Sequence, residues 1–159
     1  MDERALLLAL LDQAFDRPSW HGTNLRGSLR RLEPEQAAWR PGPKRHNVWE
    51  LVVHCAYWKY AIWRRFGGAA RGSFSLRGSN FFERPVEATA AALREDIRLL
   101  EEWHAKLRAA VAAAKPATFA QRAGKGRFTV RDLVTGAAAH DLYHAGQIQL
   151  LQRLQAGRR

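Results

Sequence analysis

Apolar residues recur every three or four positions along four segments of this 159-residue chain, and this spacing limits the possible folds more than any other feature. A period of this length is typical of amphipathic helices, and no segment shows the convincing period-two alternation of a strand. The four segments cover about residues 2–32, 47–66, 85–111 and 129–151. The sequence therefore predicts an all-α fold, a four-helix bundle in which residues 1–159 form a single domain.

Prolines set the expected limits of the first and third helices. Pro18 lies inside the first apolar pattern and should kink or split that helix, because proline lacks the amide hydrogen of the helical ladder. The Glu33–Pro34 step is expected to end the same helix. Pro85 suits the first turn of the third helix, where that hydrogen is not needed. Residues 67–84 before it are long enough for a crossover connection between the second and third helices, lying over one end of the bundle.

Capping patterns mark the expected starts of the second and fourth helices. Asn47 followed three residues later by Glu50 resembles a capping box. Thr129 and Asp132 give the same signal before the fourth helix. Residues 116–127, with a glycine-rich tip, are expected to form the loop that precedes it.

Charge and cysteine content narrow the classes of function. A net charge of +11 can attract nucleic acid or anionic surfaces, but the basic residues are spread in small groups, which favours solvated helix faces. No apolar run approaches the roughly 18–20 residues that cross a bilayer. The acidic start of the chain indicates a helix rather than a signal peptide. With Cys55 as the single cysteine no intrachain disulfide can form, so we expect a cytoplasmic protein.

Three histidines lie on the apolar stripes of two predicted helices. His54 lies on the stripe of the second helix, and His140 and His144 lie one turn apart on the stripe of the fourth. A buried imidazole without a partner is costly, whereas neutral imidazole is a good ligand for zinc, nickel or ferrous iron. Three protein ligands would leave a coordination position for water or substrate. The alternative, three core histidines bonded to neighbouring carbonyls or hydroxyls, stays open on these residues alone.

Two residues are candidates to support such a site. His21, just beyond the Pro18 break, falls on an inward face and could be a fourth ligand, a proton shuttle or a substrate contact. It could equally be a half-buried histidine bonded to the backbone. Glu50 lies one turn before His54 and could hold its second ring nitrogen, although the capping box already accounts for this residue.

The remaining candidates concern the surroundings of the site. Trp58 is expected in the core and in the pocket wall, and Gln147 could line the pocket on the face of the histidine pair. Cys55 points away from its histidine neighbour and is expected to be a small buried hydrophobe. His104 is expected to be structural and His46 to be exposed. No residue receives a catalytic role.

Five segments carry a combination of residues that is typical of one protein family: His46–His54, Ala139–Ile148, Trp20–Gly22, Trp39–Pro41 and Pro43–His46. These segments resemble the DinB-like family, a group of damage-inducible, metal-binding four-helix bundles. The resemblance covers almost the whole chain, and its last-helix motif is fairly specific when combined with the earlier histidine.

The resemblance implies a bundle with a long connection between its second and third helices. It also implies a divalent metal, nickel or zinc first and iron or manganese as alternatives, held by His54, His140 and His144. Some relatives are thiol S-transferases that use low-molecular-weight thiols such as bacillithiol or mycothiol. Others resemble hydrolases or isomerases, many have no known activity, and homodimers are common.

Three hypotheses about function follow. The first is a metal-dependent enzyme of the thiol S-transferase or hydrolase type that acts on a small molecule. The second is a non-catalytic metal-binding protein of the stress response. A basic nucleic-acid-binding bundle ranks last, because no helix-turn-helix, zinc-finger or stacking-platform motif is visible. No membrane partner is expected.

Overall fold

The computed structural model describes residues 2–67 and 72–157, and the chain is all-helical over these ranges. Four long helices are present: α1 (Glu3–Phe15), α4 (Val48–Gly67), α5 (Ala90–Ala113) and α6 (Val130–Ala156). The short helices in the connections are α2 (Leu25–Ser28), α3 (Pro34–Ala38) and the 3-10 helix η1 (Pro116–Ala120). Within the described ranges the extended pairing is confined to an isolated bridge between Arg122 and Thr129. The prediction of an all-α fold is therefore confirmed.

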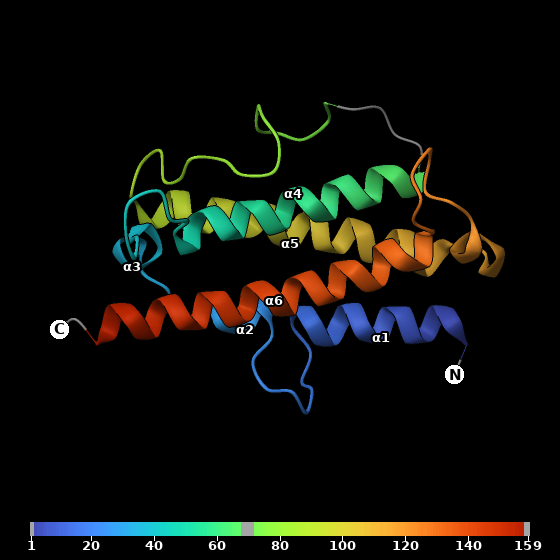
Figure 1. The fold of residues 1–159 in the computed structure, drawn as a ribbon, viewed down its shortest axis with the longest axis horizontal. Coiled ribbons are helices and arrows are strands. Elements are labelled where there is room, and N and C mark those ends of the chain that lie inside the picture. Colours follow the sequence, from blue (N-terminus) through green and yellow to red (C-terminus); the bar gives the residue numbers. More distant parts are fainter. Residues whose placement is uncertain (1, 68–71, 158–159) are drawn as a thin grey trace.

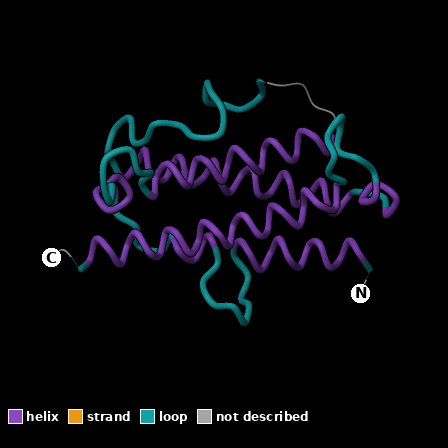
Figure 2. Tube along the Cα trace, in the orientation of Figure 1, coloured by secondary structure: helices purple, strands orange, loops and turns teal. Residues whose placement is uncertain are grey.

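The long helices lie side by side with nearly aligned axes (Figures 1 and 2). α4 packs against α5 and α6, and α1 packs against the same two helices. α4 and α5 run in one direction, whereas α1 and α6 run in the other (Figure 1). Because α4 and α5 are parallel, α4 ends at the opposite end of the molecule from the start of α5.

The connection between α4 and α5 consequently returns along the length of α4 (Figure 1), rather than over one end of the helices as the sequence predicted. Residues 68–71 of the predicted connection lie outside the described residues. Further along, Phe74 and Phe82 are buried and their rings contact Tyr57 of α4. These contacts fix the returning chain against the outer face of α4.

The predicted break of the first helix near Pro18 is confirmed. α1 ends at Phe15 and a non-helical segment, residues 16–24, follows. The apolar stripe beyond the break predicted too much helix, because only α2 is helical there. Leu29 is buried all the same, from the turn that follows α2. The apolar residues beyond the break therefore reflect burial of their side chains and not a continuous helix.

Pro34 begins a helix rather than ending one, which corrects the prediction made from the Glu33–Pro34 step. It occupies the first turn of α3, where its missing amide hydrogen costs nothing and its fixed φ suits the helix. The amide of Glu33 donates to Gln36 Oε1 at 3.1 Å and closes this turn.

The third predicted helix begins later than Pro85. The amide of Ala92 donates to Thr89 Oγ1 at 3.2 Å, and α5 starts at Ala90. Pro85 lies in the preceding loop, and the side chain of Val86 is 83% exposed instead of lying on the inward stripe. The start of α5 is therefore set by Thr89, whose side chain satisfies a free helix amide. It is not set by Pro85, which is only compatible with a first helical turn.

The predicted starts of the second and fourth helices are confirmed. The amide of Glu50 donates to Asn47 Oδ1 at 2.8 Å at the beginning of α4. At the beginning of α6, Thr129 and Asp132 each bond the other's backbone amide, which completes a capping box. The predicted loop over residues 116–127 contains η1 as an unpredicted turn of 3-10 helix.

Buried apolar side chains form two clusters that hold α4 and α6 in place. The larger cluster includes Trp49 of α4 and Leu100 of α5, and the smaller includes Leu11 of α1 and Val134 of α6. No helix in the described ranges is long and apolar enough to cross a membrane. The packing of α4 on α6 places the inward faces of these two helices opposite one another.

Candidate metal centre

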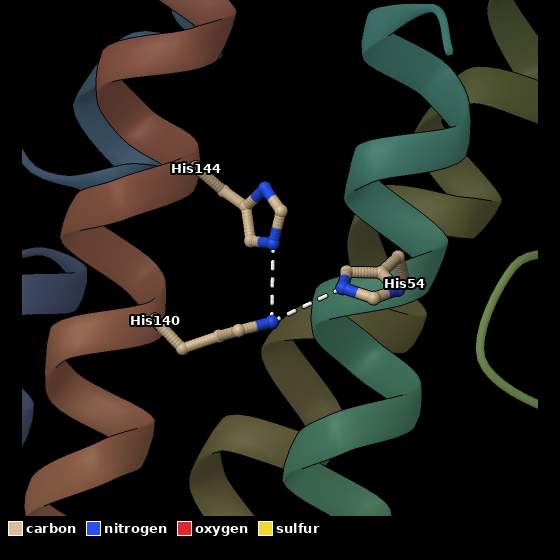
Figure 3. A group of neighbouring side chains, drawn as sticks. All are labelled: His54, His140 and His144. Atoms are coloured by element: carbon tan, nitrogen blue, oxygen red, sulfur yellow. Dashed lines mark hydrogen bonds between the residues drawn. The ribbon is translucent and has the colours of Figure 1, made fainter.

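Three histidines of α4 and α6 point toward one another (Figure 3). His140 Nε2 lies 3.1 Å from His54 Nε2 and 3.0 Å from His144 Nε2. The three nitrogen atoms all lie within 4.8 Å of one another. His54 and His144 are buried and His140 is partly buried. The fold thus brings together the three residues that the sequence singled out as ligands.

Hydrogen bonds on the far side of two rings determine where the lone pairs lie. His54 Nδ1 is 2.9 Å from the carbonyl oxygen of Asn80, and His144 Nδ1 is 2.7 Å from Gln147 Oε1. Since both partners are acceptors, both Nδ1 atoms carry hydrogen and both Nε2 atoms carry a lone pair. His140 Nε2 has at most one hydrogen to donate, so one of the two lone pairs has no donor within the cluster.

Burial keeps the three imidazoles neutral. Desolvation is the main cause that lowers the pKa of His54, and it lowers the pKa of His140 to about 3 and that of His144 to about 4. The neighbouring histidines add to the effect, because a second positive charge in the cluster would be repelled. At neutral pH all three rings are therefore neutral, with one nitrogen of each free of hydrogen, which is the form that binds metal ions.

This donor set fits a divalent transition metal. Three neutral nitrogens converge, and two of the rings donate their other N–H to a carbonyl or amide oxygen, as metal-binding histidines commonly do. A cation would satisfy the lone pair that no donor in the cluster reaches. Imidazole ligands suit zinc, nickel, copper or iron better than magnesium or calcium, which prefer oxygen.

A second group of potential ligands is less suitable. Donor atoms of Cys55, His140 and Asp141 also lie within 4.8 Å of one another. Asp141 is committed to a buried ion pair, with Lys59 Nζ 2.5 Å from its Oδ2. Burial raises the pKa of the Cys55 thiol, so this sulfur stays protonated and, as predicted, packs as a small hydrophobe. The histidine group is the better metal site.

Glu50 takes neither of the two roles that the sequence left open for it, a contact with His54 and the capping box. Its carboxylate accepts hydrogen bonds from Arg40 and from His46 Nδ1, the latter at 2.8 Å, and it does not complete the capping box of Asn47. Burial alone would raise the pKa of Glu50, but these two partners outweigh it and lower that pKa. Glu50 is therefore an ionised carboxylate that orients His46.

The connection between α4 and α5 supplies two residues of the site that the sequence did not identify. Asn80 accepts from His54 through its backbone and from Trp58 Nε1 through its side chain, at 3.0 Å. The ring of Phe81 stacks between His46 and His54, with centroid distances of 3.7 and 4.0 Å. The sequence contained an aromatic pair here, but its contact with α4 depends on the path of the returning chain.

A pocket of about 770 Å³ opens beside the three histidines. Trp58 and Gln147 line it, as the sequence predicted, and so does His46, which is 48% exposed. Gln147 also donates to Tyr143 Oη at 2.9 Å, which orients its amide oxygen toward His144. The other lining residues are Pro41, Arg45, Leu51, His54, Asn80, Phe81, His140, Tyr143, His144, Leu150 and Leu151.

The two remaining histidine predictions have different outcomes. His21 is exposed in the segment between α1 and α2 and lines neither the pocket nor the histidine group, so its predicted inward position was wrong. The helical register does not continue past the end of α1, which removes the basis of that prediction. His104 is buried and stacks on Phe15 at 3.7 Å, as a structural residue would.

Comparison with known protein families finds a match for most of the chain. A family model described as the DinB superfamily matches residues 4–148, which is most of the chain and includes all three histidines of the cluster. No curated protein and no solved structure matches the chain.

Proposed function

This chain belongs to the DinB superfamily, and from that premise we propose that it binds one divalent metal ion through His54, His140 and His144. The observation that carries the proposal is the convergence of three neutral Nε2 atoms, two of which have tautomers fixed by oxygen acceptors. The proposed metal is nickel or zinc, with iron or manganese as alternatives. The proposed architecture is one domain, residues 1–159, with the long helices as a four-helix bundle and the α4–α5 connection as its crossover.

The proposed activity is that of a metal-dependent enzyme, a thiol S-transferase or a hydrolase, on a small molecule. The metal would lower the pKa of a thiol or a water molecule in the pocket. The walls of the pocket are mainly apolar, and Trp58 offers an aromatic surface to a substrate. His46 donates from Nδ1 to Glu50, which leaves Nε2 free to accept a proton from a bound molecule.

The proposed partners follow from the pocket and from the cysteine content. The pocket has the size of a small-molecule site, and a low-molecular-weight thiol is the proposed cosubstrate. The buried thiol of Cys55 is consistent with the proposed cytoplasmic location. A homodimer is the proposed assembly, whereas membranes and nucleic acids are not proposed partners.

Turnover assays separate the enzyme from the non-catalytic alternative, a metal-binding stress-response protein. Metal-loaded protein is incubated with bacillithiol, mycothiol or glutathione and an electrophile such as monochlorobimane, and conjugation is followed by fluorescence. We expect turnover that is lost in His144→Ala and falls about 100-fold in His46→Gln, which keeps its metal. Absence of turnover with every thiol, in protein whose melting temperature falls when a chelator is added, would instead support the non-catalytic role.

A further inference from the structure

A second pocket lies between α4 and α6, beyond the histidine cluster. It measures about 300 Å³ and is lined by the segments 58–65 of α4 and 132–141 of α6. The first pocket uses earlier residues of α4 and later residues of α6. Trp58 and His140 line both pockets, so the two cavities lie on opposite sides of this pair of residues.

The walls of this second pocket are mainly apolar. Ile62, Leu133 and Ala137 line it, and Phe128 lines it with a side chain that is 46% exposed. A pocket of this size and character buries a short aliphatic chain or an aromatic ring.

Arg65 gives the pocket a charge that is not neutralised. Lys59 and Asp141 also line the cavity, but each is the other's buried partner. Asp132 is committed to the cap of α6. Of the charged lining residues in the described chain, Arg65 is the one that takes part in neither an ion pair nor a helix cap.

The positive charge continues past the mouth of the pocket. Arg65 and Phe128 also line a neighbouring hollow of about 370 Å³, which includes Arg64 and Lys125. An anionic group at Arg65 would therefore lie among three cationic side chains. The pairing of an apolar cavity with a cationic mouth selects a molecule that has one apolar end and one anionic end.

We propose that the second pocket binds an amphipathic anion, with a short acyl chain or aryl group between α4 and α6 and a carboxylate or phosphate at Arg65. The site then accommodates two ligands at once, one on each side of His140. This second statement rests on the proposed function, whereas the binding itself needs no metal.

Two glycines of α6 provide a matched pair of variants. Gly136 lines the second pocket, and a Cβ added there would meet no atom within 4 Å. Gly146 is equally open but lies outside both pockets. Leucine at position 136 would extend from this open Cβ position into the cavity, and leucine at 146 would test the general effect of the substitution. Both changes raise helix propensity, so loss of folding is not expected.

Calorimetric titration with octanoate tests the proposal in metal-free protein. We expect one molecule bound per chain, about tenfold or more weaker binding in Gly136→Leu because the cavity is filled, and unchanged binding in Gly146→Leu. Octanamide, which lacks the charge, and the variant Arg65→Gln with octanoate should each bind about threefold to fivefold more weakly, as expected for one exposed ion pair.

The proposal is overturned if octanoate fails to bind or binds Gly136→Leu as tightly as the wild type. Equal binding of octanoate and octanamide would overturn the anionic class of ligand. Because the titration uses metal-free protein, these outcomes do not depend on the metal site. Failure of the proposed function would appear separately, as absence of metal from a protein that still binds octanoate.

Discussion

At the scale of the residue, the role of each buried histidine depends on what its second ring nitrogen contacts. His54 and His144 donate from Nδ1 to oxygen atoms and present lone pairs to the cluster. His104 is different: its Nδ1 has no hydrogen-bond partner among the described residues, and its ring stacks on Phe15. The same side chain therefore presents a lone pair to a candidate metal site in one place and serves as packing in another.

His104 is expected to make the stability of the protein depend on pH. Burial lowers its pKa to about 2 in the folded protein, whereas the unfolded chain has an ordinary value near 6.5. Below pH 6.5 the unfolded state binds a proton that the folded state does not. The free energy of unfolding therefore falls as pH falls, by up to about 1.4 kcal/mol per pH unit from this residue.

Urea denaturation at pH 7, 6 and 5 in the presence of a chelator measures this effect. The variant His104→Leu places an apolar side chain of similar size against Phe15, and this side chain cannot be protonated. Its stability should decline less steeply toward pH 5 than that of the wild type. Parallel curves for the two proteins would show that His104 does not contribute.

The sequence predicted single residues well where a helical stripe was sufficient. His54, His140 and His144 lie on stripes of helices that formed as predicted, so their convergence followed once α4 packed on α6. The hydrogen-bond partners of their second ring nitrogens were harder to predict from the sequence. The carbonyl oxygen of Asn80 is a backbone atom of the connection between α4 and α5, and no side-chain pattern in the sequence indicates it.

At the scale of the element, a buried ion pair links the two helices that carry the site. Lys59 of α4 and Asp141 of α6 are 2% and 1% exposed. Lys59→Met alone leaves an unpaired buried carboxylate and should lower the free energy of unfolding by about 3–5 kcal/mol. The double variant Lys59→Met/Asp141→Leu removes both charges and should recover most of that loss.

Urea denaturation of both variants tests the ion pair against an exposed one. Glu102→Gln breaks the surface pair with Lys106 and should change stability by less than about 0.5 kcal/mol. A double variant no more stable than Lys59→Met, or a loss in Lys59→Met no larger than that of the control, would contradict the role of the buried pair.

The helices themselves were predictable to different degrees. α4 and α6 have both an apolar stripe and a side-chain cap, and their starts agree with the sequence. α5 begins at the cap of Thr89 rather than at Pro85. Proline is compatible with a first helical turn, but it does not satisfy the free amides at the start of the helix. The path of the connection depends on α5 running parallel to α4, which is a property of packing and not of any local segment.

At the scale of the whole molecule, folding gathers charges that are separate in the sequence. Arginines around α2 and on α5 line one groove of about 770 Å³ together with Leu29, Leu32 and Ile97. Glu101 is the one acidic residue of that lining and pairs with Arg26. The arginines involved are Arg26, Arg30, Arg31, Arg94 and Arg98. Spacing along the chain did not indicate this groove, because it forms only where two distant segments pack.

The all-α class and the superfamily were accessible from sequence for a common reason. Helical periodicity and the histidine segments are local sequence patterns. They can be recognised in a single sequence without information about tertiary contacts. The second pocket and the contribution of the connection are consequences of tertiary packing.

We propose above all that His54, His140 and His144 together hold one divalent metal ion. Elemental analysis of protein purified without a histidine tag tests it most directly, on the wild type, on His140→Ala, and on His21→Ala as a control in an exposed histidine. We predict about one metal ion per chain in the wild type and in His21→Ala, and almost none in His140→Ala, since two remaining ligands bind far more weakly. A wild-type protein without stoichiometric metal, or a His140→Ala variant with the metal content of the wild type, would contradict the claim.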